Sequence, residues 1–215
     1  MATNTTFDTL QEDVRAYIER GSSVDVTVYE QIPRLINSAE RRLATELKIQ
    51  GFINVVSMTL TAGQSVYDKP DRWRDTVAFG IATGAGFTDS KTVFAREYGY
   101  CRNYWPNPAT QGEPTYYADY DYSHWLVVPT PDAAYPAEII YYELLPLLDD
   151  TNQSNWLTDY APRLLLYATL LECAPFLKED SRIAVWQAFY DREAGMVNGQ
   201  DLAKILDRSA VRKEA

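Results

Sequence analysis

The fold of this chain is decided by the segment Leu164-Leu165-Leu166-Tyr167-Ala168-Thr169-Leu170-Leu171, which is apolar on every side. The segment is too short to cross a membrane, which takes about 20 apolar residues, so it predicts a buried core helix. Pro162 fits the first turn of this helix, which Thr158 or Asp159 would cap. Pro175 should end or kink the same helix.

A further helix is predicted on the C-terminal side, with Ser181 as its cap. Gly195 and Gly199 should weaken its last turns. Its inner face would consist of Ile183, Trp186, Phe189 or Tyr190, Ala194 and Val197. Residues 201–215 alternate in charge and carry one strong apolar stripe, made of Leu202, Ile205 and Leu206. Such a segment is marginal as an isolated helix, so we expect a partner to hold it.

Residues 1 to about 51 also have a helical pattern. Thr5 or Thr6 would cap a first helix, and Gly21 would end it. Its apolar stripe consists of Phe7, Leu10, Val14 and Tyr17. In a second helix, Thr27 and Glu30 have the spacing of a capping box, and Gly51 would close the helix. The apolar stripe of this second helix consists of Ile32, Leu35, Ile36, Ala39, Leu43 and Leu47. Pro33 should kink the first turns, or the regular helix should begin only near it.

The middle of the chain is mostly β in pattern. Residues 55–60 and 65–67 flank the turn 62–64, which suggests a hairpin. A short helix is predicted over 95–105, before Pro106 and Pro108. Further strands are expected over 77–82, 91–94, 115–122, 124–128 and 137–143.

These patterns predict an α+β fold, in which N- and C-terminal helices form a bundle and a β-rich, sandwich- or barrel-like domain is inserted between them. The expected parts are residues 1–51 and 149–200 for the bundle and 52–148 for the β-rich domain. Residues 201–215 would form an extended tail.

Charge is distributed unevenly along the chain. Twenty basic and thirty acidic residues give a net charge of −10. The stretch from Asn103 to Pro162 contains no Lys or Arg and carries nine of the acids: Glu113, Asp119, Asp121, Asp132, Glu138, Glu143, Asp149, Asp150 and Asp159. A protein that grips DNA by neutralising phosphates would not have this composition.

The residues that usually carry chemistry are sparse. The single histidine, His124, has no second His for a metal pair and no plausible Ser or Cys partner nearby, so we expect it to be structural. The common phosphate-binding and hydrolase motifs do not occur. Two acidic segments, 119–121 and 149–152, could offer oxygens to a cation, but neither has the EF-hand pattern. Within a strand, Asp119 and Asp121 would share one face and repel unless solvated or near a cation. We therefore predict no enzyme, no catalytic or metal-binding residue and no cofactor, although a pair of glycosidase carboxylates depends on distances that a sequence does not give.

The N-terminal residues lack the pattern of a secretory signal, and Cys101 and Cys173 form no close pair. We expect both cysteines to be free, buried thiols in a reducing compartment.

Aromatic residues are unusually frequent, with 16 Tyr and 5 Trp. Three interpretations are possible: these residues are favoured in strands, they line a protein interface, or they stack on sugars. Ten of them crowd the middle of the chain: Tyr98, Tyr100, Tyr104, Trp105, Tyr116, Tyr117, Tyr120, Tyr122, Trp125 and Tyr135.

Several blocks resemble those of bacteriophage head-to-tail adaptor proteins, in the family's order and over nearly the whole chain. The block Ala174-Pro175-Phe176-Leu177-Lys178 is the most specific of them. The others are 36–43, 113–118, 129–132 leading into Tyr141-Tyr142, 155–157, 162–172 and 179–182 with Trp186. Pro33 departs from the family's long first helix.

The resemblance implies a structural virion protein at the head–tail interface, made in the host cytoplasm. Such adaptors form a dodecameric ring below the portal, contact tail or nozzle proteins and let DNA pass through the ring without specific binding. By this resemblance the tail would contact the portal through Leu202, Ile205, Leu206, Arg208, Arg212 and Lys213. Acids at Asp119, Asp121 and Glu138 would face the channel and repel phosphates, or would only solvate an outer surface. The alternative functions are a carbohydrate-binding β-module and a carboxylate-dependent hydrolase.

Overall fold

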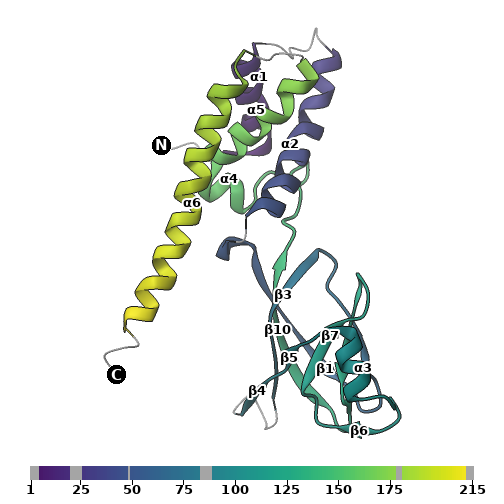
Figure 1. The fold of residues 1–215 in the computed structure, drawn as a ribbon. Helices are drawn as coiled ribbons and strands as arrows, with labels where there is room; N and C mark the ends of the chain where they lie inside the picture. The colour runs from purple at the N-terminus through teal and green to yellow at the C-terminus, as the bar shows by residue number, and fades with distance from the viewer. Residues whose placement is uncertain (1–4, 20–25, 48, 83–88, 178–180, 212–215) are drawn as a thin grey trace. The chain divides into compact units, whose positions relative to one another are not determined.

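The computed structural model in Figure 1 describes residues 5–19, 26–47, 49–82, 89–177 and 181–211, with the side chains of Val26, Gln50 and residues 200–211 left out. The polypeptide divides into two compact units. One consists of the residues up to Phe52 together with those from Leu144 on, and the other consists of Ile53–Glu143. The first is helical and the second is mostly β, which confirms the predicted α+β class.

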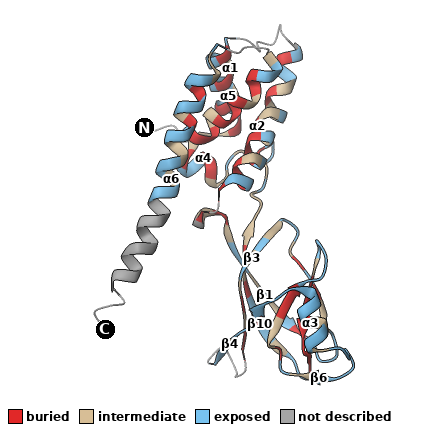
Figure 2. Ribbon diagram, in the orientation of Figure 1, coloured by how far each residue is buried: buried red, intermediate tan, exposed pale blue. Residues whose placement is uncertain are grey.

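The helical unit is built around α5 (Pro162–Leu177), which contacts α1 (Phe7–Ile18), α2 (Val26–Glu46), α4 (Trp156–Tyr160) and α6 (Ile183–Val211). A 3₁₀ turn, η1 (Gln50–Phe52), follows α2. Helix α5 is buried over most of its circumference, as Figure 2 shows in red. Its buried residues are Leu164, Leu165, Ala168, Thr169, Leu170, Leu171, Cys173 and Ala174. The apolar segment therefore forms the core helix that its composition predicts.

The residues that cap the helices agree only in part with the sequence predictions. Thr6 caps α1 in a capping box with Thr9, and Ile18 replaces Tyr17 in the buried stripe. Asn155 caps α4, so neither Thr158 nor Asp159 caps α5. The predicted end of the first helix at Gly21 lies outside the described residues.

Two prolines lie inside helices. Helix α2 begins at Val26, well before Pro33, so the predicted start near Pro33 and the capping role of Thr27 are both wrong. The carbonyl of Tyr29, which lacks its usual donor because of Pro33, belongs to an exposed residue and can bond to water. Helix α5 continues through Pro175 and ends at Leu177.

Later helix boundaries also differ from the predictions. Helix α2 ends at Glu46, before Gly51. Helix α6 runs on through Gly195 and Gly199, where each glycine costs only about 1 kcal/mol relative to alanine.

A polar cluster joins three helices. Arg42 of α2 forms an ion pair with Glu172 of α5 (2.7 Å) and lies over the ring of Tyr190 of α6. Tyr190 donates a short hydrogen bond to Glu46. This cluster and the buried Trp186 fix the first half of α6 on the bundle.

The β unit contains two four-stranded sheets. The first has the order β1 (Ile53–Leu60), β10 (Tyr135–Glu143), β3 (Trp73–Ala82), β4 (Ser90–Thr92), and the second β2 (Val66–Asp68), β8 (His124–Val128), β7 (Tyr116–Asp119), β5 (Phe94–Ala95). A small pair, β6 (Gln111–Gly112) with β9 (Thr130–Pro131), and helix α3 (Tyr98–Tyr104) complete it. Both sheets contribute to one core, made of Leu60, Phe79, Ile81, Ala137 and Ile139 with Tyr67, Val93, Tyr117, Trp125 and Val127.

The predicted hairpin does not form. Strand β1 pairs with β10, and β2 pairs with β8 of the other sheet. Gly63 adopts a φ of +81° in the intervening turn, which favours glycine. The hydroxyl of Tyr67 accepts from the N–H of Thr61 (2.9 Å) and lies 2.7 Å from the carbonyl oxygen of Gln64. Burial of Tyr67 in the shared core thus carries the chain from one sheet to the other.

Three further segments of the β unit differ from the predictions. The segment 91–94 splits between β4 and β5, and because Phe94–Ala95 pairs with β7, α3 begins only at Tyr98. Strand β7 ends at Asp119, whereas the prediction extended it to Tyr122.

Candidate assembly surface

Helix α3 packs on the second sheet through one buried side chain, Cys101. This thiol lies in a small apolar cluster with Ala118, Leu126 and Val128. Burial raises the pKa of Cys101 and also that of Cys173, the latter to about 12. Both cysteines are free and buried, as predicted. With Cys101 facing the sheet, the remaining residues of α3 are left at the surface of the β unit.

The side chains that α3 exposes are mainly tyrosines, and we name them with their neighbours the tyrosine surface. Its members are Tyr98, Tyr100, Tyr104, Tyr116 and Tyr120, together with Arg96 and Arg102. The rings contact one another: Tyr104 and Tyr116 meet edge to face at 5.0 Å, and Tyr100 and Tyr116 at 5.5 Å. Tyr98 and Tyr120 lie 5.9 Å apart. Yet Tyr98, Tyr100, Tyr104 and Tyr120 each remain about half exposed.

Two arginines lie over these rings. Arg96 is 5.7 Å from the ring centre of Tyr100 and 5.6 Å from that of Tyr116. Arg102 lies 5.3 Å from the ring of Tyr98 and donates to its hydroxyl (3.1 Å). The backbone N–H of Arg96 bonds to the carbonyl of Tyr117, which ties the start of this segment to β7. The surface is thus a fixed array of rings and guanidinium groups.

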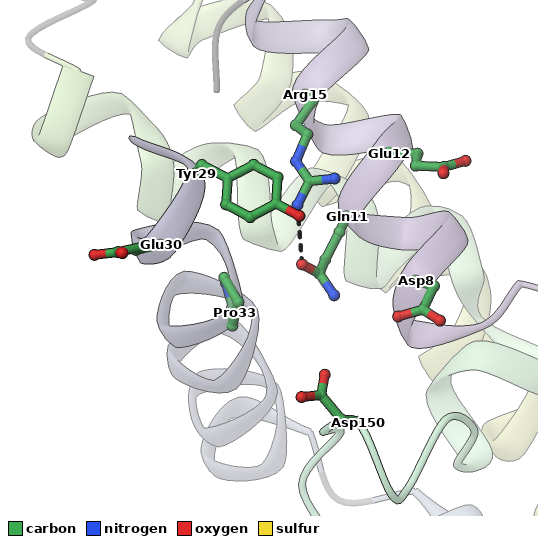
Figure 3. A pocket seen from close by; sticks show the side chains of 8 residues that line it. All are labelled: Asp8, Gln11, Glu12, Arg15, Tyr29, Glu30, Pro33 and Asp150. Atoms are coloured by element: carbon green, nitrogen blue, oxygen red, sulfur yellow. Dashed lines mark hydrogen bonds between the residues drawn. The ribbon is translucent and has the colours of Figure 1, made fainter. Parts of the chain in front are cut away.

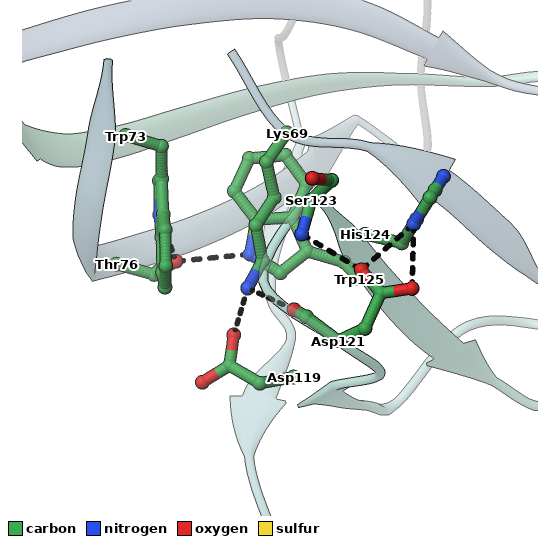
Figure 4. Close-up of polar contacts among 8 residues, drawn as sticks. All are labelled: Lys69, Trp73, Thr76, Asp119, Asp121, Ser123, His124 and Trp125. Carbon is green, nitrogen blue, oxygen red and sulfur yellow. Dashed lines mark hydrogen bonds and ion pairs between the residues drawn. The ribbon is translucent and has the colours of Figure 1, made fainter. Parts of the chain in front are cut away.

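Beside the second sheet, the ammonium of Lys69 is enclosed by several acceptors (Figure 4). Its Nζ lies 2.7 Å from the carboxylate of Asp119 and donates to the carbonyl of Asp121 (2.9 Å). It also lies 3.6 Å from the ring of Trp73. The Lys69 side chain is only 2% exposed, whereas that of Asp119 is 63% exposed. The lysine therefore anchors the loop after β2 to the end of β7.

The predicted acids at Asp119 and Asp121 are separated by this arrangement. Asp119 ends β7, while Asp121 lies in the following turn and does not share a strand face with it. Asp121 contacts Nδ1 of His124 (2.8 Å), and this hydrogen bond is the main cause of its lowered pKa. Nε2 of His124 faces Asp68 at 3.2 Å. The histidine thus has an ordinary structural role as a partner of surface carboxylates.

The third predicted channel acid lies on the other sheet. Glu138 is exposed in the middle of β10, opposite Ser57 of β1 and Gly80 of β3. Unlike Asp119 and Asp121, Glu138 forms no ion pair within the part of the chain that the structure describes. The structure therefore does not bring the three acids together.

The acidic loop 149–152 closes on itself. Oδ1 of Asp149 accepts from the N–H and hydroxyl of Thr151 (2.7 Å each) and from the N–H of Asn152 (2.8 Å). These hydrogen bonds lower the pKa of Asp149. Among the described residues there is no group of three or more His, Cys, Asp or Glu side chains placed to hold a metal ion.

The segment that follows the β unit is held by a buried carboxyl group of α2. Glu40, which is 3% exposed, accepts from the N–H of Leu148 (3.1 Å) and from the amide of Asn155 (2.6 Å). With the side-chain amide of Asn37 turned so that its nitrogen faces these acceptors, Asn37 donates to Glu40 (2.9 Å) and to the carbonyl of Leu148 (3.0 Å). Burial raises the pKa of Glu40 to about 7.

The helical unit also has an open pocket of about 540 Å³ between α1 and α2 (Figure 3). Arg15 donates to Gln11 (3.1 Å) and lies over the ring of Tyr29 there. The acids that line the pocket are Asp8, Glu12, Glu30 and Asp150. These four acids are spread over α1, α2 and the loop 149–152. We interpret the pocket as a solvated polar surface.

Of the residues predicted to contact the portal, Leu202, Ile205, Leu206 and Arg208 belong to the last turns of α6, where the structure describes the helix but no side chain. Arg212 and Lys213 lie outside the described residues. Their proposed contacts therefore stay predictions.

Sequence reasoning missed the pairing of arginines with tyrosines on the tyrosine surface. For one of the two pairs a signal was present, because Tyr98 and Arg102 of α3 are four residues apart, whereas Arg96 precedes the helix. Residues at that spacing face each other on a helix. The buried positions of Glu40 and Lys69 had no such signal, since their partners are distant in the sequence.

None of the helices among the described residues combines the length and the apolar character that a membrane-spanning helix requires. No curated protein matches the chain. The model of the SU10 adaptor protein family matches residues 5–212, which includes both units and nearly the whole sequence. A match of this extent confirms the resemblance to phage adaptors and indicates a structural role in a virion, in assembly with other virion components. The chain therefore belongs to the SU10 adaptor protein family.

Proposed function

We propose that this protein forms a ring below the portal, joins the capsid to the tail and continues the channel through which DNA passes. The observation that carries this proposal is the family match over residues 5–212. The ring is dodecameric in the proposal, its partners are the portal and a tail or nozzle protein, and the role is structural without catalysis.

In this proposal the helical unit is a bundle that carries the β unit as an insertion. The parts are residues 1–51 and 149–200 for the bundle, 52–148 for the β-rich domain and 201–215 for the portal-contacting tail. The length of α6 supports the last assignment, because the helix continues to Val211, well past the buried Trp186 and Tyr190. A helix that extends beyond the residues it packs against in its own unit needs another surface to stabilise its end.

The proposed channel lining depends most on Glu138. Asp119 is neutralised by Lys69, and Asp121 by its contact with His124 when that ring is protonated. Of the three carboxylates, Glu138 is the one whose negative charge is not balanced by a nearby cation, since it is exposed and unpaired among the described residues. A ring of such carboxylates would repel phosphates and prevent DNA from sticking.

The assembly is tested with the purified full-length chain, alone and with purified portal. We expect light scattering and electron microscopy to give a ring of twelve copies on the portal, and we expect phage that lacks the protein to accumulate DNA-filled heads without tails. A chain that stays monomeric with and without portal, together with normal joining of heads and tails in its absence, would overturn the proposal.

The channel role is tested with Glu138→Lys in phage particles. We expect slower DNA ejection from these particles, with the difference shrinking as salt is raised, because salt screens the attraction to phosphate. Asp191→Lys, an exposed acid of α6 with the same charge change, is the control. Equal ejection rates for both variants and the wild type would place Glu138 outside the channel.

A further inference from the structure

We propose that the tyrosine surface is a subunit–subunit interface, which binds an acidic surface of a second copy of this chain. The inference rests on the proposed ring and adds which face of the β unit makes the contact and with what chemistry.

The tyrosine surface is prearranged for binding. Its rings contact one another with centroid distances of 5.0 to 6.2 Å, and the buried Cys101 and the backbone bond of Arg96 hold the segment on the sheet. Rigid tyrosines give a large contact area while little conformational entropy remains to be lost on binding. Phe94, which is 54% exposed on β5, extends the exposed aromatic area.

The two arginines of the tyrosine surface keep a positive charge that no carboxylate of the described residues balances. Three other cations of the β unit, Lys69, Arg72 and Lys91, each lie 2.6 to 2.7 Å from a carboxylate of the same unit. Arg96 and Arg102, by contrast, contact tyrosine rings and form no ion pair within the described part of the chain. Arg96 donates one N–H to the carbonyl of Ala95 (3.1 Å), and Arg102 donates its Nε–H to the hydroxyl of Tyr98 (3.1 Å). Each guanidinium group keeps its remaining N–H donors for a carboxylate of another molecule.

A second copy of the chain has the negative charge that this surface would bind. The chain carries ten more acidic than basic residues, and its β unit alone has eleven acids and six bases. A second copy therefore offers the excess carboxylates that the two arginines lack. A head-to-tail contact joins two different surfaces of the same protein, and such contacts close into rings when the rotation permits. Tyrosine and arginine are also the residues that most often dominate the energy of protein interfaces.

The test compares the full-length wild-type chain with the double variant Arg96→Glu, Arg102→Glu. We expect at least a tenfold increase in the dissociation constant between subunits, measured by analytical ultracentrifugation or, if assembly needs the portal, as copies bound per portal. The conservative pair Arg96→Lys, Arg102→Lys keeps the charge but not the planar fork, and should show a smaller effect. Unchanged circular dichroism of the monomer checks folding.

A second measurement does not depend on those variants. A photo-crosslinking phenylalanine analogue placed at Tyr98 should crosslink to a peptide of another copy of the chain. Crosslinks only to portal or tail protein, or assembly of the double variant equal to the wild type, would overturn the inference and leave the ring proposal intact. A wild-type chain that forms no oligomer under any condition would instead refute the ring itself.

Discussion

Replacing Glu40 by glutamine should change how the stability of the helical unit depends on pH. The carboxyl group is 3% exposed, and its three neighbours, Leu148, Asn155 and Asn37, are all donors. Arg41 is the nearby cation that favours the charged form, but its effect is smaller than that of burial. Removing the carboxylate from water therefore dominates and raises the pKa of Glu40 from 4.5 to about 7.

The size of the effect follows from these two pKa values. Because the pKa of Glu40 is higher in the folded than in the unfolded chain, folding takes up a proton between pH 4.5 and 7. The stabilisation is therefore complete below pH 4.5 and is lost as the pH rises to about 7. Between pH 5 and 8 the wild type should lose about 2.5 kcal/mol through this group, at 1.36 kcal/mol for each pKa unit.

The assay is urea unfolding of the full-length chain, followed by circular dichroism at the helix band and repeated at several pH values from 5 to 8. Glutamine cannot ionise, so the variant does not lose this stability as the pH rises. The difference in free energy of unfolding, Glu40→Gln minus wild type, should therefore increase by roughly 2 to 3 kcal/mol from pH 5 to 8. At pH 5, where Glu40 is protonated, the variant should still be the less stable protein, because the NH₂ group of glutamine cannot accept a hydrogen bond whereas the hydroxyl oxygen of the carboxyl group can.

Glu30→Gln is the matched control, since Glu30 is exposed on the same helix and should leave the pH profile of the wild type unchanged. Parallel profiles for the wild type and Glu40→Gln would refute the reasoning, because they would mean that Glu40 is charged and adequately solvated throughout.

Three further variants test the packing. Tyr67→Phe should cost about 1 to 3 kcal/mol in chemical denaturation, because the hydroxyl satisfies polar backbone groups of the turn after β1. Lys69→Met should cost about 1.5 to 3 kcal/mol rather than the 3 to 5 typical of a fully buried ion pair, because Asp119 stays solvated; a loss above about 4 kcal/mol would contradict this view. Gly51→Ala should lower the melting temperature of the helical unit, since a Cβ there would lie 2.1 Å from the indole of Trp156; an unchanged melting temperature would show that the indole moves freely.

Hydrophobic periodicity was a good guide wherever neighbours in the sequence share one environment. The apolar run 164–171 is a core helix, and the strand predicted over 124–128 has those bounds. The N-cap of α1 at Thr6 followed from its capping chemistry. Prolines misled the prediction at α2, because the orphaned carbonyl of Tyr29 is at the surface and water can satisfy it.

The candidate site was predictable only in part. The crowding of tyrosines between residues 98 and 122 indicated an interface as one of three interpretations, and the family resemblance selected a structural phage protein. Which tyrosines are exposed depends on α3, whose position is set by one buried cysteine. The acids at Asp119 and Asp121 looked equivalent in the sequence but have different partners in the structure.

The sequence by itself determined the α+β class, the buried core helix, the regional negative charge and the family. These properties depend on composition, local periodicity and motif order, which are all written along the chain. Only the tertiary structure decided that β1 pairs with β10 instead of β2, and that Glu40 holds a segment over a hundred residues away. It also decided that Arg96 and Arg102 lie over tyrosine rings and form no ion pair among the described residues. Each of these depends on contacts between residues far apart in the sequence, or on which partner is missing nearby, and local patterns carry no information about either.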